Sequence, residues 1–328
     1  MTRRGASAGP TPGLCARASR GDPEWNTDRG WQTQVEAQGR QGKVSGGDVR
    51  GVRLYWCRLA RRPAALVGTV VFLTIVLLAA IGPTISPYPP NEQDAEAPLE
   101  APSGRHFFGT DQFGRDVFSR VLSGARGVVT VSGLGTAMAV AIGVFSGLFA
   151  GYQRGVRSEI ITRVYDLLLC IPSLLLAMVL IASVGPSKVN IVLVVGILYT
   201  PNVGRVVRSV VLDLKSKEFV EAAKARKERR GYILFREILP NTLGPLMVES
   251  AMRFSYSIFL VASLGFLGLG VQPPASDWGL MVSDARDFLQ LAPWMLLFPS
   301  AAIAALVIAT NLMSDGLRQI TAPAGSAG

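Results

Sequence analysis

The sequence holds very little that could bind a metal ion or form disulfide bonds. Among its 328 residues there are one histidine, His106, and three cysteines. Cys15, Cys57 and Cys170 lie far apart and show no C-x-x-C spacing, which excludes a disulfide framework and the usual zinc or redox motif. A structural zinc site needs four ligands, so no metal site is expected. Cys170 sits in an apolar run, where we expect a small buried side chain.

Charge is also scarce, because only 17% of the residues are charged, whereas an ordinary soluble domain has roughly 25%. Hydrophobic residues make up 49% of the chain, yet aromatic residues only 8%. The apolar residues are gathered into long runs without charge. Several such runs in one chain favour membrane-spanning helices over the buried helices of a soluble core.

The uncharged runs are long enough to cross a bilayer. A spanning helix needs about 20 mainly apolar residues, because the hydrocarbon core is roughly 30 Å thick and each residue rises about 1.5 Å. No charged residue lies between Arg62 and Glu92, and further uncharged runs recur along the chain; the one after Lys188 is the weakest. We therefore expect an all-α, polytopic membrane protein with six transmembrane helices. Their predicted positions are near residues 64–84, 128–151, 163–184, 190–210, 243–269 and 291–313.

Basic residues gather beside alternate spans, as they do in cytoplasmic loops. The other loops hold Lys188 alone or acids mixed with bases. Both termini and the loop 211–240 are therefore predicted to be cytoplasmic. The formal net charge of +10 then reflects topology, with membrane lipid and no nucleic acid as a partner. The basic residues that carry this argument are Arg50, Arg53, Arg58, Arg61, Arg62, Arg154, Arg157, Lys215, Lys217, Lys224, Arg226, Lys227, Arg229, Arg230 and Arg236.

The two ends of the chain differ from its body. Residues 1–50 are rich in Gly, Arg, Ser and Gln, and are predicted to be a disordered cytoplasmic tail. No apolar segment of a secretory signal follows the early arginines. Residues 51–320 are the expected transmembrane domain, and residues 321–328 a short C-terminal tail.

A glycine-containing segment at residues 106–116 invites comparison with a nucleotide site. Gly109 and Gly114 have the spacing of a phosphate-binding loop. That loop needs a lysine for the phosphates and a hydroxyl for magnesium, whereas this chain has Arg115 and Asp116. Nucleotide binding by this segment is therefore not expected.

The same segment is better explained as the start of a helix. Thr110 or Asp111 can act as an N-cap, and Asp111 can pair with Arg115 four residues on. We therefore predict a short interfacial helix ahead of the second span. Its apolar face would carry Phe113, Val117 and Val121.

Residues 216–241 of the predicted cytoplasmic loop are expected to form two short helices outside the membrane. Helix-forming Ala and Lys residues follow Glu221 up to Arg226. Pro240 is expected to force the residue before it out of helical geometry. A solvated basic linker is the simpler alternative. The apolar side of the second helix would consist of Ile233, Leu234, Ile238 and Leu239.

Several motifs resemble one transporter family. Glu221-Ala222-Ala223, followed by Ile238-Leu239-Pro240, resembles the EAA loop of permeases from binding-protein-dependent ABC importers. Gly109-Thr110-Asp111 with Gly114-Arg115-Asp116 resembles the periplasmic signature of the dipeptide/oligopeptide/nickel branch, in its C-type subunit. Further matches, within a resemblance that covers residues 55–320, are Ile171-Pro172-Ser173, Phe266-Leu267-Gly268-Leu269-Gly270, Trp278-Gly279, Asn311-Leu312 and Asp315-Gly316-Leu317-Arg318.

The resemblance implies a type I ABC importer permease fold in the inner membrane of a bacterium. It also implies three kinds of partner: a second homologous permease, two ATP-binding subunits, and a periplasmic or lipid-anchored solute-binding protein. ATP would be used by the partner subunits, so this chain would bind no cofactor and would not be an enzyme. The loop containing Glu221 would transmit force from the ATPases.

Alternatives to a peptide importer stay open at this point. Di- or oligopeptides are the first choice of substrate, and nickel or another small solute is the second. A self-contained secondary transporter is the rival from another class. Such transporters commonly carry ionisable residues within their spans, and these spans are nearly free of charge.

The chain departs from the family pattern at two positions. The family usually has glycine where this chain has Lys227, and an acidic residue where it has Val261. A non-glycine residue is strained in left-handed geometry, so we expect the first helix of the loop to run on to Gly231. Within the fifth span, Arg253 is expected to form a structural pair with Glu249, one turn earlier.

Overall fold

The computed structural model describes residues 63–321, except Arg154. The predicted tail at residues 1–50 lies outside that range, as do residues 322–328. Within the described residues the fold is helical, and the only strand-like pairing is one antiparallel bridge between Thr110 and Asp116. The prediction of an all-α protein is confirmed.

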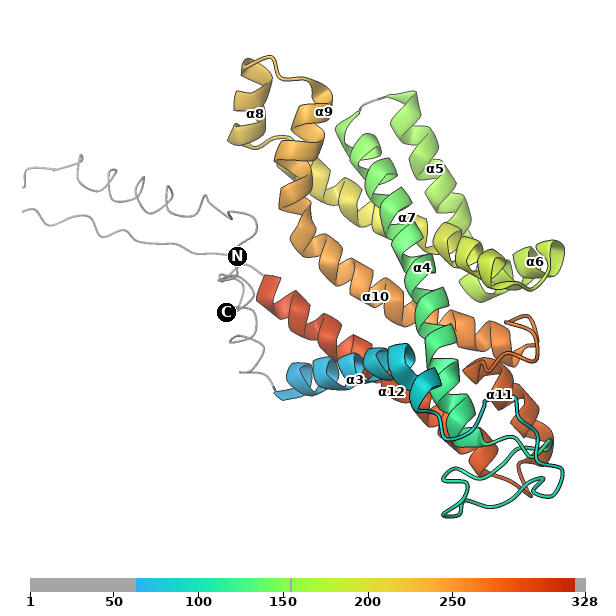
Figure 1. Ribbon diagram of the computed structural model, residues 1–328. Coiled ribbons are helices and arrows are strands. Elements are labelled where there is room, and N and C mark those ends of the chain that lie inside the picture. Colours follow the sequence, from blue (N-terminus) through green and yellow to red (C-terminus); the bar gives the residue numbers. More distant parts are fainter. Residues whose placement is uncertain (1–62, 154, 322–328) are drawn as a thin grey trace, which may run out of the picture. The chain divides into compact units, whose positions relative to one another are not determined.

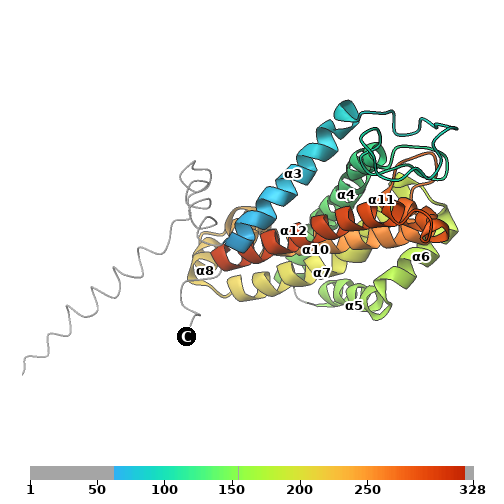
Figure 2. The ribbon, with the colours of Figure 1, turned by 90° about the horizontal axis from the view of Figure 1, so that it is seen from below.

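The helices follow one another with short connections, apart from the loops that follow α3 and α10 (Figures 1 and 2). Their bounds are α3 Pro63–Ile85, α4 Val117–Tyr152, α5 Val156–Cys170, α6 Ser173–Val184, α7 Lys188–Leu214, α8 Glu218–Ala225, α9 Arg230–Tyr232, the π-helical segment η1 Ile233–Ile238, α10 Leu239–Phe266, α11 Trp278–Asp284, the 3-10 segment η2 Ala285–Phe288 and α12 Trp294–Thr321.

Four of these helices are long and apolar enough to cross a membrane: α3, α4, α7 and α12. The pair α5 and α6 makes a fifth candidate, if the two count as one broken span. Helix α10 is 28 residues long but less apolar, because it carries Glu249, Arg253 and several serines. Its place corresponds to the predicted fifth span. The count of six spans is compatible with this structure and stays a prediction.

The predicted third span is not one straight helix. Helices α5 and α6 meet at an angle of 93°. The cause is Pro172, since a proline disfavours helical geometry in the residue before it, and Ile171 is extended at φ −97° and ψ 132°. Cys170 ends α5 and is exposed. The prediction of a buried Cys170 is wrong, because it stands on an open side of α5 and not in a packed run.

Helices α4 and α7 approach each other closely along a row of glycines. Gly143, Gly147 and Gly151 recur every fourth residue of α4 and face valines of α7. A Cβ atom built on Gly143 would lie 2.7 Å from Cβ of Val203, which is closer than real atoms come. Small residues at this spacing let two membrane helices pack backbone to backbone. Helices α4 and α7 are therefore closely packed along this row.

The connections gather at two ends of the bundle. In Figure 1, α8 and α9 lie at one end, whereas α11 and the loop after α3 lie at the other. Helix α10 joins the two ends, since it follows η1 and leads to the connection that ends at α11. The loop between α3 and α4, residues 86–116, is called the α3–α4 loop below, and residues 216–241 the coupling loop.

Candidate functional site

The coupling loop begins with α8, an amphipathic helix. Val220 and Ala223 are fully buried, and they pack in one cluster with Ile233 and Ile238 of η1. The opposite side of α8 is exposed and carries Glu221, with Ala222, Lys224 and Phe219 around it. One face of α8 therefore anchors the loop to the bundle, and the face with the glutamate is open to a partner.

Helix α8 ends at Ala225, and the prediction that it continues to Gly231 is wrong. Lys227 adopts φ +58°, the left-handed conformation that the sequence argument rejected. The turn holds because the amide of Glu228 donates to the carbonyl of Ala223 at 3.2 Å. The amide of Lys227 also donates to the carbonyl of Lys224 at 2.9 Å. This is the Schellman pattern, which caps the last carbonyl groups of a helix.

Packing across the turn explains why lysine is tolerated there. Val220 and Ala223 must face Ile233 and Ile238, and a longer α8 would carry the chain past that contact. Arg226 adds ion pairs to Glu228 at 3.7 Å and to Glu237 at 3.6 Å. These contacts outweigh the roughly 1–2 kcal/mol cost of the left-handed residue. Gly231 lies inside α9 instead of ending α8.

Pro240 does not break the helix, which corrects a second expectation. Leu239 stays helical at φ −55° and ψ −44°, and α10 runs through Pro240. The preceding segment η1 is π-helical, and the amide of Leu239 donates to the carbonyl of Leu234. A π-helical turn widens the backbone locally, which removes the clash between a proline ring and the carbonyl four residues earlier.

Glu221 lines a pocket of about 580 Å³ between the coupling loop and the end of α4. Its lining holds three cations, Lys215, Lys224 and Arg230, besides the one carboxylate. The ammonium groups of Lys215 and Lys224 donate to the carbonyls of Gly151 and Lys215, each at 3.1 Å. The pocket is thus a charged recess on the exposed side of the loop.

At the other end of the bundle, Asp111 organises the α3–α4 loop. Its Oδ1 accepts from the amides of Phe113 at 2.9 Å and Arg115 at 3.0 Å, and its Oδ2 lies 2.6 Å from Nε of Arg115. The predicted pair between Asp111 and Arg115 is confirmed. Gly109 and Gly114 have φ of +72° and +71°, which explains glycine at both turns.

The short interfacial helix predicted to begin at Thr110 or Asp111 is absent: residues 109–116 form a turn, and Val117 and Val121 belong to the long helix α4. Asp116, not Thr110 or Asp111, caps the following helix, since its Oδ2 accepts from the amide of Ser119 at 2.8 Å. Asp111 uses its carboxylate within the turn and is not available as a cap. The other oxygen of Asp116 lies 2.9 Å from Nδ1 of His106, which is buried.

Two tryptophans fasten this loop and α4 to the C-terminal third of the chain. Nε1 of Trp294 donates to the carbonyl of Thr110 at 3.1 Å, and Nε1 of Trp278 donates to the carbonyl of Val121 at 2.8 Å. A Cβ atom on Gly109 would collide with the ring of Trp294. Sequence reasoning noted Trp278 only through the family resemblance and missed Trp294, because the partners are far apart in the chain.

Two carboxyl groups at α11, those of Asp277 and Asp284, have pKa values that are raised by burial. Burial raises the pKa of Asp277, although its carboxylate caps α11 by accepting from the amides of Gly279 and Leu280. Burial also raises the pKa of Asp284, against the opposing pull of Arg115 and Arg120. The α3–α4 loop and α11 therefore share one partly buried charge cluster.

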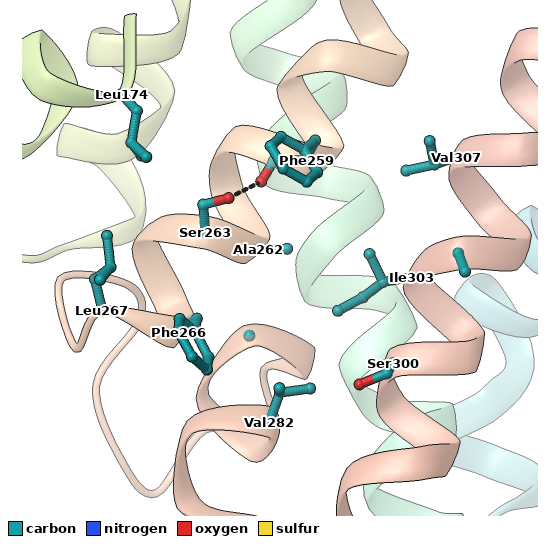
Figure 3. A pocket seen from close by; sticks show the side chains of 12 residues that line it. Leu174, Phe259, Ala262, Ser263, Phe266, Leu267, Val282, Ser300, Ile303 and Val307 are labelled. Carbon is teal, nitrogen blue, oxygen red and sulfur yellow. Dashed lines mark hydrogen bonds between the residues drawn. The ribbon is translucent and has the colours of Figure 1, made fainter. Parts of the chain in front are cut away.

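An apolar pocket of about 550 Å³ lies between α6, α10, α11 and α12 (Figure 3). Phe259 and Phe266 of α10 line it, opposite Ile303 of α12, with Leu174 of α6 at one edge. The hydroxyl of Ser263 points back and donates to the carbonyl of Phe259 at 2.8 Å. No charged side chain lines this pocket, so it suits apolar groups.

The predicted pair inside α10 is present as well. Nε of Arg253 lies 2.8 Å from Oε1 of Glu249, and the guanidinium stands over the ring of Tyr256 at 4.7 Å. Val261, the second departure from the family pattern, is buried in an apolar cluster with Leu264. A carboxylate at that position would be desolvated within this apolar cluster.

Comparison with known proteins identifies the family. Residues 143–324 match the model described as binding-protein-dependent transport system inner membrane component. Residues 52–102 match the N-terminal transmembrane domain of oligopeptide transport permease C.

A dipeptide transport system permease protein of Alkalihalophilus pseudofirmus is 40% identical over 81% of this chain and 88% of its own length. A glutathione transport system permease protein of Pectobacterium atrosepticum is 38% identical over 83% of this chain and 90% of its own. In structure, a chain from the inward-facing MetNI methionine ABC transporter aligns with a TM-score of 0.52 at 15% identity, over 62% of this chain and 97% of that one. The last likeness shows the fold alone.

Proposed function

Because this chain belongs to the family of inner membrane components of binding-protein-dependent transport systems, we propose that it forms one half of the pathway of an ATP-driven importer of di- or oligopeptides. It is a multi-pass membrane component of a transporter and not an enzyme. The peptide substrate is supported by the relatives, which are permeases for dipeptides, di/tripeptides and glutathione.

The observation that carries the proposal is the exposed face of α8. Glu221 and Phe219 are exposed there, and Tyr232 of α9 lies on the same loop with 41% of its surface open. A helix with a buried anchor face and an open face of charged and aromatic side chains is suited to seat in a groove of a partner. We assign this face to one of two ATP-binding subunits, which would use the ATP.

The other end of the bundle would meet the solute-binding protein. The α3–α4 loop is acidic, with Glu92, Asp94 and Glu96 beside one another on a pocket of about 420 Å³. A second, homologous permease would complete the pathway, with the apolar pocket of Figure 3 as the surface nearest to solute or partner. The periplasmic or lipid-anchored solute-binding protein would deliver peptide at this end of the bundle.

This arrangement requires the α3–α4 loop outside the cell and the coupling loop, with both termini, inside. In a chain with Cys15, Cys57 and Cys170 replaced by serine, Gln93→Cys should react with an impermeant thiol reagent in intact cells. Lys227→Cys should react only after the cells are opened. The reverse pattern would overturn the orientation and the assignment of the coupling loop.

The role of α8 is tested by charge reversal within the assembled transporter. Glu221→Lys should reduce ATPase association or uncouple ATP hydrolysis from uptake, since it adds a fourth cation to a recess that already holds three. Glu218→Lys makes the same charge change on α8 away from that recess and serves as the matched control. Normal uptake in the Glu221 variant would remove the coupling assignment.

The substrate is tested by uptake in cells that lack other peptide permeases. Cells expressing the chain with its partner subunits should accumulate labelled dialanine in a manner that depends on ATP. The chain purified alone should neither bind nor hydrolyse ATP. Accumulation of nickel without accumulation of peptide would assign the transporter to the alternative substrate.

A further inference from the structure

Helix α5 has three distinct faces. Ser158 and Tyr165 are buried against the bundle. Val164 and Leu167 form an exposed apolar face. A third face is exposed and polar, and its residues recur every three to four positions, so they fall within about 60° of one another around the helix. They are Glu159, Arg163, Asp166 and Cys170.

Helix α7 carries a matching polar row that meets the first. Arg205 forms an ion pair with Asp166, and the two side chains are 50% and 60% exposed. On α5 itself, Arg163 pairs with Glu159 at 2.6 Å. The joined surface carries five charges, of both signs, because Asp213 of the α7 row adds a third carboxylate to the two ion pairs. The α7 row consists of Asn202, Arg205, Ser209 and Asp213.

The ion pair lies inside two of the predicted spans, those near residues 163–184 and 190–210, and not beyond their cytoplasmic ends. Asp166 stands about 15 Å along α5 from Val156, and Arg205 about 14 Å along α7 from Leu214. Arginine can extend its head toward the interface, but aspartate has too short a side chain to do so. Exposed charges within a span face a water-filled cavity and not lipid.

We propose that the polar face of α5 and α7 lines the water-filled exit of the pathway toward the cytoplasm, and that the Arg205–Asp166 pair screens the charge of the solute as it leaves. This rests on the proposed peptide import and on the proposed orientation. With charges of both signs present, the surface offers a partner to each charged end of a zwitterionic peptide. Loss of one partner leaves a fixed charge that acts on every passing solute.

The water path is tested with the native thiol of Cys170, about 21 Å along α5 from its first residue. In inside-out vesicles holding the complete transporter, with Cys15→Ser and Cys57→Ser, an anionic impermeant methanethiosulfonate should modify Cys170. Val164→Cys in the Cys170→Ser background is the control, because it is shallower and on the apolar face. It should stay unmodified. Protection of Cys170, or equal reaction at both positions, would overturn the proposal.

Charge screening is tested by the uptake ratio of Ala-Lys to Ala-Glu. Asp166→Asn should slow Ala-Lys and favour Ala-Glu, and Arg205→Gln should do the opposite, by about threefold for each peptide. Dividing the uptake ratio of each variant by the wild-type ratio removes the preference of the solute-binding protein for one of the two peptides. A purely structural pair would lower both rates equally and leave the ratio unchanged, which contradicts the proposal. If the wild type imports neither peptide, the proposed substrate fails while the thiol result still decides the water path.

Discussion

The indole of Trp294 donates its hydrogen bond to the carbonyl oxygen of Thr110, 3.1 Å away and 184 positions earlier in the chain. Thr110 is fully buried, and its hydroxyl donates to the carbonyl of Ala97 at 2.6 Å. The first turn of α12 is thereby fixed to the turn that precedes α4. The α3–α4 loop thus has a fixed position against α12, even though it contains no regular secondary structure.

Replacing Trp294 by phenylalanine should destabilise this connection. The variant keeps an aromatic ring but leaves the Thr110 carbonyl without its donor, at a cost of about 1–3 kcal/mol. The midpoint of thermal unfolding in detergent should fall accordingly. Phe107→Leu, on an exposed aromatic of the same loop, should leave the midpoint nearly unchanged. Equal midpoints for Trp294→Phe and wild type would show that the bond contributes nothing.

Gly114→Ala should be among the most damaging single changes in the α3–α4 loop. Gly114 has φ +71°, and a Cβ atom there would overlap the backbone carbonyl of Asp94. The left-handed geometry alone costs about 1–2 kcal/mol, and the collision adds to it. Gly104→Ala is the control, because a Cβ atom there meets nothing within 4 Å. The measurement is the yield of folded protein and its thermal midpoint; a tolerated Gly114→Ala would refute the predicted strain.

Lys227→Gly should stabilise the coupling loop, because glycine enters positive φ without the strain that lysine bears. We expect slower exchange of the Glu228 amide, which donates to the carbonyl of Ala223, by a factor that corresponds to about 1 kcal/mol. Lys224→Gly, inside α8, should have the opposite effect at a similar size. Faster exchange in Lys227→Gly would mean that the lysine side chain supports the turn.

The stability of the folded protein should depend on pH through the carboxyl group of Asp277. Because burial raises its pKa in the folded protein, the folded state binds more protons than the unfolded state above the ordinary value of about 3.9. Stability contributed by this residue therefore falls as pH rises from that value through the raised pKa. Asp277→Asn should remove this part of the slope, while the similar contribution of Asp284 stays in both proteins. A difference in thermal midpoint that is constant between pH 4 and 7 would contradict the raised pKa.

Features set by neighbouring residues could be predicted from the sequence. The pairs of Asp111 with Arg115 and of Glu249 with Arg253 are four residues apart, and that spacing brings the side chains together in one turn. The exposed side of α8 around Glu221 follows in the same way from helical spacing. The four longest apolar helices were also found, because the length of an uncharged run is a local property.

Features set by distant contacts could not be predicted. Lys227 takes a left-handed turn because α8 packs against η1, a contact that no local propensity contains. The bend at Pro172 did not show in the uncharged run that follows Asp166, because that run continues across the break as far as Lys188. Cys170 was assigned to the core on the same apolarity, although it stands beside the charged face of α5.

Helices α9, η1 and α10 have a mechanical consequence, because residues 230–266 are helical without interruption. The combined length is about 55 Å at the usual rise per residue. Helix α8 is packed onto the η1 end of this continuous but bent helix (Figure 1), whose far end, at Gly265, touches the backbone of α11. If α8 receives the stroke proposed for the coupling loop, one continuous helix would carry it to the opposite end of the bundle, with no loop in between to absorb it.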